Sequence, residues 1–159
     1  MGRWRRVACI LAGAWAGLMA GVGFIAAPSL FSLLARADAG RVAARLFAVD
    51  AQVGLGLGLA LLLIARRLAQ ADAERGGSVF STEMLLALGV LFCIVAGHFG
   101  LQPMLESARA GGGKASFAVL HGAAAAFFVA KLGVVTALAW RLSRPGAALR
   151  VAGTTFSGS

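Results

Sequence analysis

Charged side chains are scarce in this chain of 159 residues, and those of negative sign are scarcer still. Only 13% of the residues are charged, six acidic residues stand against 15 Lys and Arg, and 60% are hydrophobic, with a mean hydropathy of +0.86. A soluble domain has about a quarter of its residues charged and just under half apolar. Too few polar side chains remain to cover a water-facing surface, so composition excludes a soluble globular protein.

Sequence motifs of enzymes and disulfide frameworks are also missing. The chain has no Walker loop, no strand-linked Gly-rich fingerprint, and no HExxH, CxxC or GxSxG motif. Its two cysteines, Cys9 and Cys93, both fall in apolar stretches, where small buried thiols are ordinary. The sequence therefore predicts a protein that is not an enzyme, and it calls for no cofactor.

Long apolar runs fill most of the chain. Each reaches the roughly 20 residues that a helix needs to cross a hydrocarbon layer of about 30 Å. We predict an all-α polytopic membrane protein, a bundle of four transmembrane helices in a domain over 1–144, followed by a short flexible cytoplasmic tail over 145–159. The predicted spans are 7–27, which is expected to end at Pro28, and then 46–65, 84–102 and 117–140.

Basic residues gather at the ends of these runs, as in Arg3/Arg5/Arg6 and Arg66/Arg67. This distribution is typical of topology signals and lipid-headgroup contacts and argues against nucleic acid as a partner. Nine Lys and Arg lie on the side that holds both termini and five on the other. The positive-inside rule then predicts an inner-membrane protein with both termini in the cytoplasm.

Polar side chains inside the predicted spans are the candidate site residues, because ionisable groups at membrane depth are rare. At about 1.5 Å per residue, measured from the ends of the apolar runs, Asp50 and His121 lie about 6 Å inside their spans and His98 about 5 Å. These three would form one outer layer that ties helices, binds a small cation, relays protons, or holds copper, zinc or haem. The full candidate set is Asp50, Gln52, His98, Gln102, His121 and Lys131.

Two further features have two interpretations each. Lys131 lies about 21 Å below the outer end of its span, so it either snorkels towards the cytoplasmic headgroups or serves a substrate or counter-ion. Small residues recur every four positions at Gly13, Gly17 and Gly21. Such a stripe either packs within the bundle or forms the face of a homo-oligomer.

Short motifs in a fixed order carry a family resemblance. They are Phe24-x-x-x-Pro28-x-x-Phe31, Ala39-Gly40, Leu46-Phe47, Pro103 and Phe117-x-x-x-His121. In their order and spacing, over roughly Val7 to Leu142, the chain resembles the domain-of-unknown-function 4149 family, the transmembrane-protein-205-like proteins. The resemblance implies a four-helix integral membrane protein and brings no catalytic residues.

The function predicted from these features is that of a non-enzymatic integral membrane protein with an outer Asp/His/His cluster. Two alternatives stay open: a membrane redox or metal-handling protein that uses haem or copper, and a small transporter acting as an oligomer.

Overall fold

Helices make up nearly all of the computed structural model, which describes residues 2–74, 78, 80–111 and 116–144. These helices form four rods. The first consists of α1 (Arg3–Ala20), the π-helical turn η1 (Gly21–Ala26) and α2 (Ala27–Leu33), and the second is α3 (Arg36–Ala73). The third consists of α4 (Thr82–Ile94), the π-helical turn η2 (Val95–Gly100) and α5 (Leu101–Arg109). The fourth rod is α6 (Phe117–Ser143). All four are long and apolar enough to cross a membrane. The prediction of an all-α protein with four transmembrane helices is confirmed.

Each predicted span lies inside one of these rods, but the rods are longer. The helix α3 begins at Arg36, ten residues before the predicted span at 46. Hydropathy marks the hydrocarbon layer, whereas helix propensity marks the helix, and the Ala- and Arg-rich segment before Leu46 favours helix without being apolar. The predicted tail over 145–159 lies outside the described residues.

Pro28 does not end the first rod, contrary to the prediction. It falls in the first turn of α2, directly after η1. The backbone stays helical through Ala26 and Ala27, and the π-helical turn just before Pro28 shifts the hydrogen-bond register where proline removes an N–H. The rod therefore runs on to Leu33.

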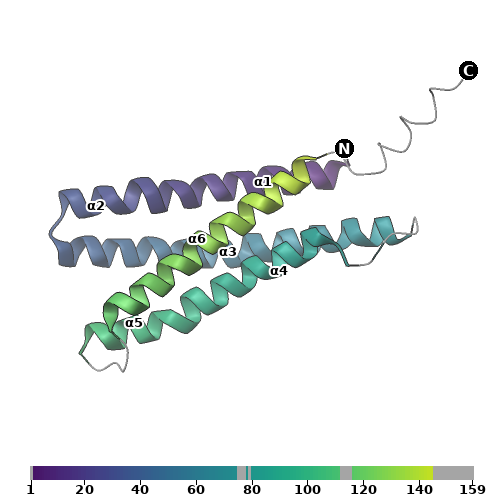
Figure 1. Cartoon of the computed structure of the whole chain (residues 1–159). Coiled ribbons are helices and arrows are strands. Elements are labelled where there is room, and N and C mark those ends of the chain that lie inside the picture. Colours follow the sequence, from purple (N-terminus) through teal and green to yellow (C-terminus); the bar gives the residue numbers. More distant parts are fainter. Residues whose placement is uncertain (1, 75–77, 79, 112–115, 145–159) are drawn as a thin grey trace, which may run out of the picture.

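The rods run alternately up and down, and α6 crosses the others obliquely (Figure 1). The start of α1 and the end of α6 lie at one end of the bundle, which we call the terminal end, and the α2–α3 connection lies at the distal end (Figure 1). The helix α6 packs against α1 and α4, and α3 packs against α4 and α1. The helices α3 and α6 both run from the distal to the terminal end.

Polar contacts join the helices at the terminal end. Arg5 of α1 donates through Nε to the carbonyl of Leu142 at 3.2 Å and through Nη2 to that of Arg141 at 2.7 Å. These carbonyls belong to the last turn of α6, which lacks a following helical turn; the Arg141 carbonyl also accepts from the Arg144 backbone N–H at 3.3 Å. The Arg141 guanidinium also lies 3.5 Å from the Glu83 carboxylate at the start of α4.

Glycines allow close approach between helices at two places on α3. A Cβ atom on Gly54 would lie 2.9 Å from Trp15 Cζ2, and one on Gly58 would lie 2.9 Å from Leu91 Cδ2. By contrast, the stripe of Gly13, Gly17 and Gly21 on α1 meets nothing within 4 Å of its virtual Cβ positions. That stripe does not pack within the described bundle, so the first of its two interpretations is not supported.

Candidate functional site

The most unusual feature of the bundle is a buried ion pair between two membrane-spanning helices. Lys131 Nζ on α6 lies 2.5 Å from Asp50 Oδ2 on α3, and their side chains are only 7% and 4% exposed. No other described charged residue is buried to this degree. The Lys131 side chain is therefore turned into the bundle, with Asp50 as its partner.

Helix register explains why these two residues meet. Asp50 comes fourteen residues after the start of α3 and Lys131 fourteen residues after the start of α6. Because both helices run from the distal end, each residue lies about 21 Å along its helix. Measuring depth from Leu46 instead had placed Asp50 in a shallower layer than Lys131. Because α3 starts at Arg36, the two residues lie at the same depth, and the predicted difference in depth between them is not observed.

Two phenylalanines cover the distal side of the ion pair. Phe47 precedes Asp50 by three residues and Phe128 precedes Lys131 by three, so each lies one turn away on the same helix face. Their rings meet edge to face with centroids 5.2 Å apart, and Lys131 Nζ lies 5.4 Å from the centre of the Phe128 ring. A Cβ on Gly23 would lie 2.6 Å from Phe128 Cε1, so that glycine in η1 makes room for the ring.

An indole approaches the pair from the terminal side. One edge of the Trp15 ring lies along α3. Its Cη2 atom would be 3.8 Å from a Cβ added to Gly58. Its Cζ2 atom would be 2.9 Å, and its Cε2 atom 3.6 Å, from a Cβ added to Gly54. The next atom along this edge is Nε1, and Gly54 lies one helical turn from Asp50. Among the described residues neither Trp15 Nε1 nor Asp50 Oδ1 has a hydrogen-bond partner, although both are buried.

The polar centre, as we call Asp50, Lys131 and Trp15 Nε1, thus has a donor and an acceptor left unsatisfied. Burying such groups costs about 1–3 kcal/mol each. Removing one member of a buried pair costs about 3–5 kcal/mol, whereas replacing both by apolar residues is often neutral. An arrangement this costly is a candidate for function rather than for stability alone.

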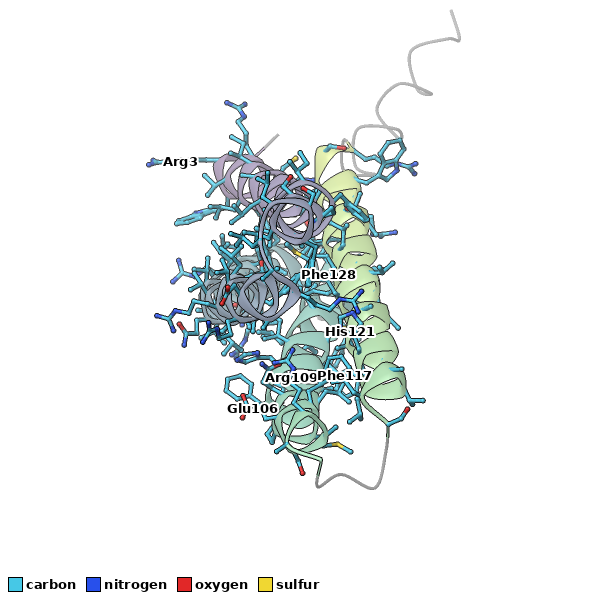
Figure 2. All side chains as sticks on the ribbon, turned by 90° about the vertical axis from the view of Figure 1, so that its left-hand side faces the viewer. Arg3, Glu106, Arg109, Phe117, His121 and Phe128 are labelled. Carbon is cyan, nitrogen blue, oxygen red and sulfur yellow. The ribbon has the colours of Figure 1, made fainter. Side chains whose placement is uncertain are left out.

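The two histidines do not join Asp50. His98 lies in η2 beside Phe99, its ring centroid 5.1 Å away, and His121 stacks on Phe117 at 5.7 Å with the rings 13° from parallel. The Arg109 guanidinium lies over the same Phe117 ring, at the distal end where α5 meets α6 (Figure 2). Within the described ranges, no three His, Cys, Asp or Glu residues group as metal ligands.

The predicted Asp/His/His layer is therefore not formed. The rod that carries His98 continues to Arg109 instead of ending near Leu101, which puts this imidazole about 16 Å from the rod's distal end. His121 lies only about 6 Å from the distal start of α6. The prediction set the ends of the helices at the ends of the apolar runs, and this error brought side chains of different depth together.

The remaining candidates are the two glutamines, which the structure places apart. Gln102 is half-buried in α5, and Gln52 is exposed on the outer face of α3. Sequence reasoning did not assign Trp15, Phe47 or Phe128 to the site. The i, i+3 repeat of Phe and charge in both helices was a signal that could have found the last two.

The fold and this site define an integral membrane protein of the helical-bundle class, multi-pass and with a polar centre inside the bundle. The family model described as "Domain of unknown function (DUF4149)" matches residues 10–114, and the chain belongs to that family. The matched part includes Asp50 and Trp15 and ends before α6, so Lys131 and His121 lie beyond it. No curated protein and no solved structure matches the chain.

Proposed function

We propose that the protein is a non-enzymatic membrane component whose working element is the Asp50–Lys131 pair, an ionic tie that links α3 to α6 across the bundle. The observation that carries this proposal is the 2.5 Å contact between two side chains that are both more than nine-tenths buried. Helices in lipid gain no hydrophobic energy from meeting each other, so a polar contact of this kind selects one arrangement among several apolar alternatives. The small cation of the predicted cluster is not needed, because the Lys131 ammonium already lies against Asp50.

The test compares the buried pair with an exposed pair on the same helix. Asp38 pairs with Arg41 on α3, but their side chains are 51% and 81% exposed. We expect Asp50→Asn to lower the free energy of unfolding from detergent micelles by about 3 kcal/mol or more, and Asp38→Asn by less than about 1 kcal/mol. The exchanged pair Asp50→Lys/Lys131→Asp should recover part of the loss.

The double variant Asp50→Leu/Lys131→Met completes this test. An apolar pair of this kind retains stability but lacks the directional contact. We expect it to fold with a broader set of distances between spin labels on α3 and α6 than the wild type. Equal losses for Asp50→Asn and Asp38→Asn, or an unchanged distance distribution in the double variant, would overturn the proposed tie.

A small transporter acting as an oligomer is the second candidate, and a specific observation favours it. The polar centre leaves an acceptor, Asp50 Oδ1, and a donor, Trp15 Nε1, open inside an otherwise apolar bundle. A water-sized solute that both donates and accepts would satisfy these groups. Proteoliposomes would be assayed for water flux by osmotic shrinkage and for proton flux by an enclosed pH dye. Flux rates equal to those of protein-free vesicles would exclude the transporter function. They would not bear on the proposed ionic tie.

The orientation is also proposed: an inner membrane, with the terminal end in the cytoplasm. Support comes from the excess of Lys and Arg on that side, nine against five. Reporter fusions after Ser143 and within the α2–α3 connection test it. A fusion after Ser143 that is active only outside the cytoplasm would reverse the assignment.

A further inference from the structure

The outward face of α3 carries an amide that no other described residue satisfies. Gln52 is exposed, and in the described part of the chain its side chain makes no hydrogen bond. It lies six residues inside the apolar run that starts at Leu46, about 9 Å from that boundary. Lipid chains offer neither donors nor acceptors, so an amide facing them keeps its full desolvation cost.

Two exposed hydroxyl side chains in the membrane-spanning rods form hydrogen bonds within their own helix. Thr136 Oγ1 donates to the carbonyl of Leu132 at 2.8 Å, and Ser29 Oγ donates to that of Ile25 at 2.6 Å. Both use the preceding turn of their own helix, which a short hydroxyl side chain reaches. The Gln52 carboxamide has two donors and an acceptor on a longer stem, and it makes no such bond. Its outward position therefore calls for a partner.

The residues that line up with Gln52 form a narrow seam suited to another helix. Exposed residues follow it at alternating intervals of four and three, the spacing of a left-handed helix pair: Arg45, Val49, Gln52, Gly56, Leu59 and Leu63. Gly56, one turn from Gln52, meets nothing within 4 Å of its virtual Cβ, so a second backbone can approach there. In lipid, small residues and interhelical hydrogen bonds are what distinguish a helix interface from the lipid-facing surface.

We propose that a second copy of this chain docks on this seam, forming a two-fold homodimer in which the Gln52 amides of the two copies hydrogen-bond to each other. Copies inserted in the same direction present the same residue at the same depth, and a carboxamide is complementary to itself. A two-fold axis along the membrane normal beside Gln52 brings the two amides together. The stripe of Gly13, Gly17 and Gly21 offers small residues without a polar group and is the weaker candidate face.

Cysteine cross-linking in native membranes tests which face is used. In a background lacking Cys9 and Cys93, single cysteines would replace Gly56 or Leu59 on the seam, and Gly17 on α1 as the matched control. Copper phenanthroline should then yield a disulfide-linked dimer from the two α3 variants and not from Gly17→Cys. Cross-linking through Gly17 alone would assign the dimer to α1 and overturn the proposal.

The role of the amide is tested by Gln52→Leu and by the conservative Gln52→Asn. Energy transfer between labelled copies, measured over a series of protein-to-lipid ratios, should show dimerisation weakened about 3- to 30-fold by Leu and largely retained by Asn. Because Gln52 contacts lipid in the monomer, the unfolding midpoint of dilute Gln52→Leu should stay unchanged. An unchanged association constant for Gln52→Leu, or a wild type that is monomeric at every ratio, would overturn the proposal.

Discussion

Substitution of Gly54 by Ala should destabilise the bundle, although alanine is the better helix former. The added Cβ would lie 2.9 Å from Trp15 Cζ2 and 3.2 Å from Ile94 Cδ1. Trp15 is 1% exposed and Ile94 2%, so neither side chain has room to move away. Inserting a methyl group into such packing costs about 1–3 kcal/mol.

Gly17→Ala is the matched control, since its Cβ would meet nothing within 4 Å on the exposed face of α1. Both variants change helix propensity by the same amount, up to about 1 kcal/mol in favour of Ala. The difference between the two therefore isolates the contact with Trp15 and Ile94. We expect Gly54→Ala to be less stable than Gly17→Ala by about 1–3 kcal/mol.

The assay is reversible unfolding in mixed micelles at rising SDS fraction, followed by circular dichroism. A second arm repeats Gly54→Ala in a Trp15→Phe background, where the smaller ring leaves space for the methyl group. There the cost should fall by about 1 kcal/mol, which a double-mutant cycle measures as coupling. Equal stabilities for Gly54→Ala and Gly17→Ala, or no coupling to Trp15, would refute the packing described for α1 and α3.

Two further predictions concern other contacts of the same bundle. Arg5→Ala should lower the free energy of unfolding by about 1 kcal/mol, because the last carbonyls of α6 lose two hydrogen bonds from a charged donor. Arg3→Ala is the control, since the Arg3 side chain makes no hydrogen bond in the described part of the chain. It should leave the free energy of unfolding unchanged within about 0.5 kcal/mol. Gly23→Ala should push the Phe128 ring away from Lys131, since its Cβ would lie 2.6 Å from Phe128 Cε1. In a background with Trp4 and Trp140 replaced by Phe, faster quenching of Trp15 fluorescence by acrylamide would report the opened polar centre. Quenching as slow as in that background with Gly23 intact would contradict this role of Gly23.

The fold was predictable from the sequence because lipid imposes one dominant rule. A run of about 20 apolar residues must form a spanning helix, since its backbone has no other way to satisfy its hydrogen bonds. The ends of the helices follow a different rule. The helix α3 continues ten residues beyond its apolar run to Arg36, because Ala and Arg favour helix in water as well.

The candidate site was predictable only in its residue list. Asp50 and Lys131 were both recognised as unusual, but their pairing depends on where each helix starts, and a shift of ten residues moves a side chain by about 15 Å. Trp15 gave no local signal of its role, and the only local signal for Phe128 was its i, i+3 spacing from Lys131. Their positions depend on contacts with glycines in other helices, Gly54 and Gly23, and these contacts are not encoded within a single span.

The helix α3 carries two polar residues only two positions apart, and they face opposite ways. At about 100° per residue, Asp50 and Gln52 are separated by about 200° around the helix axis, so one faces the bundle when the other faces lipid. Asp50 pairs through Oδ2 with Lys131 of its own chain, whereas Gln52 makes no hydrogen bond within the described residues. Changes at Asp50 should therefore alter the stability of the monomer, and changes at Gln52 its association. Because the two side chains share no partner, the effects of Asp50→Asn and Gln52→Leu on each quantity should add. A strong coupling between the two substitutions would mean that binding of the second copy also affects the polar centre. The ionic tie and the dimer contact would then depend on each other.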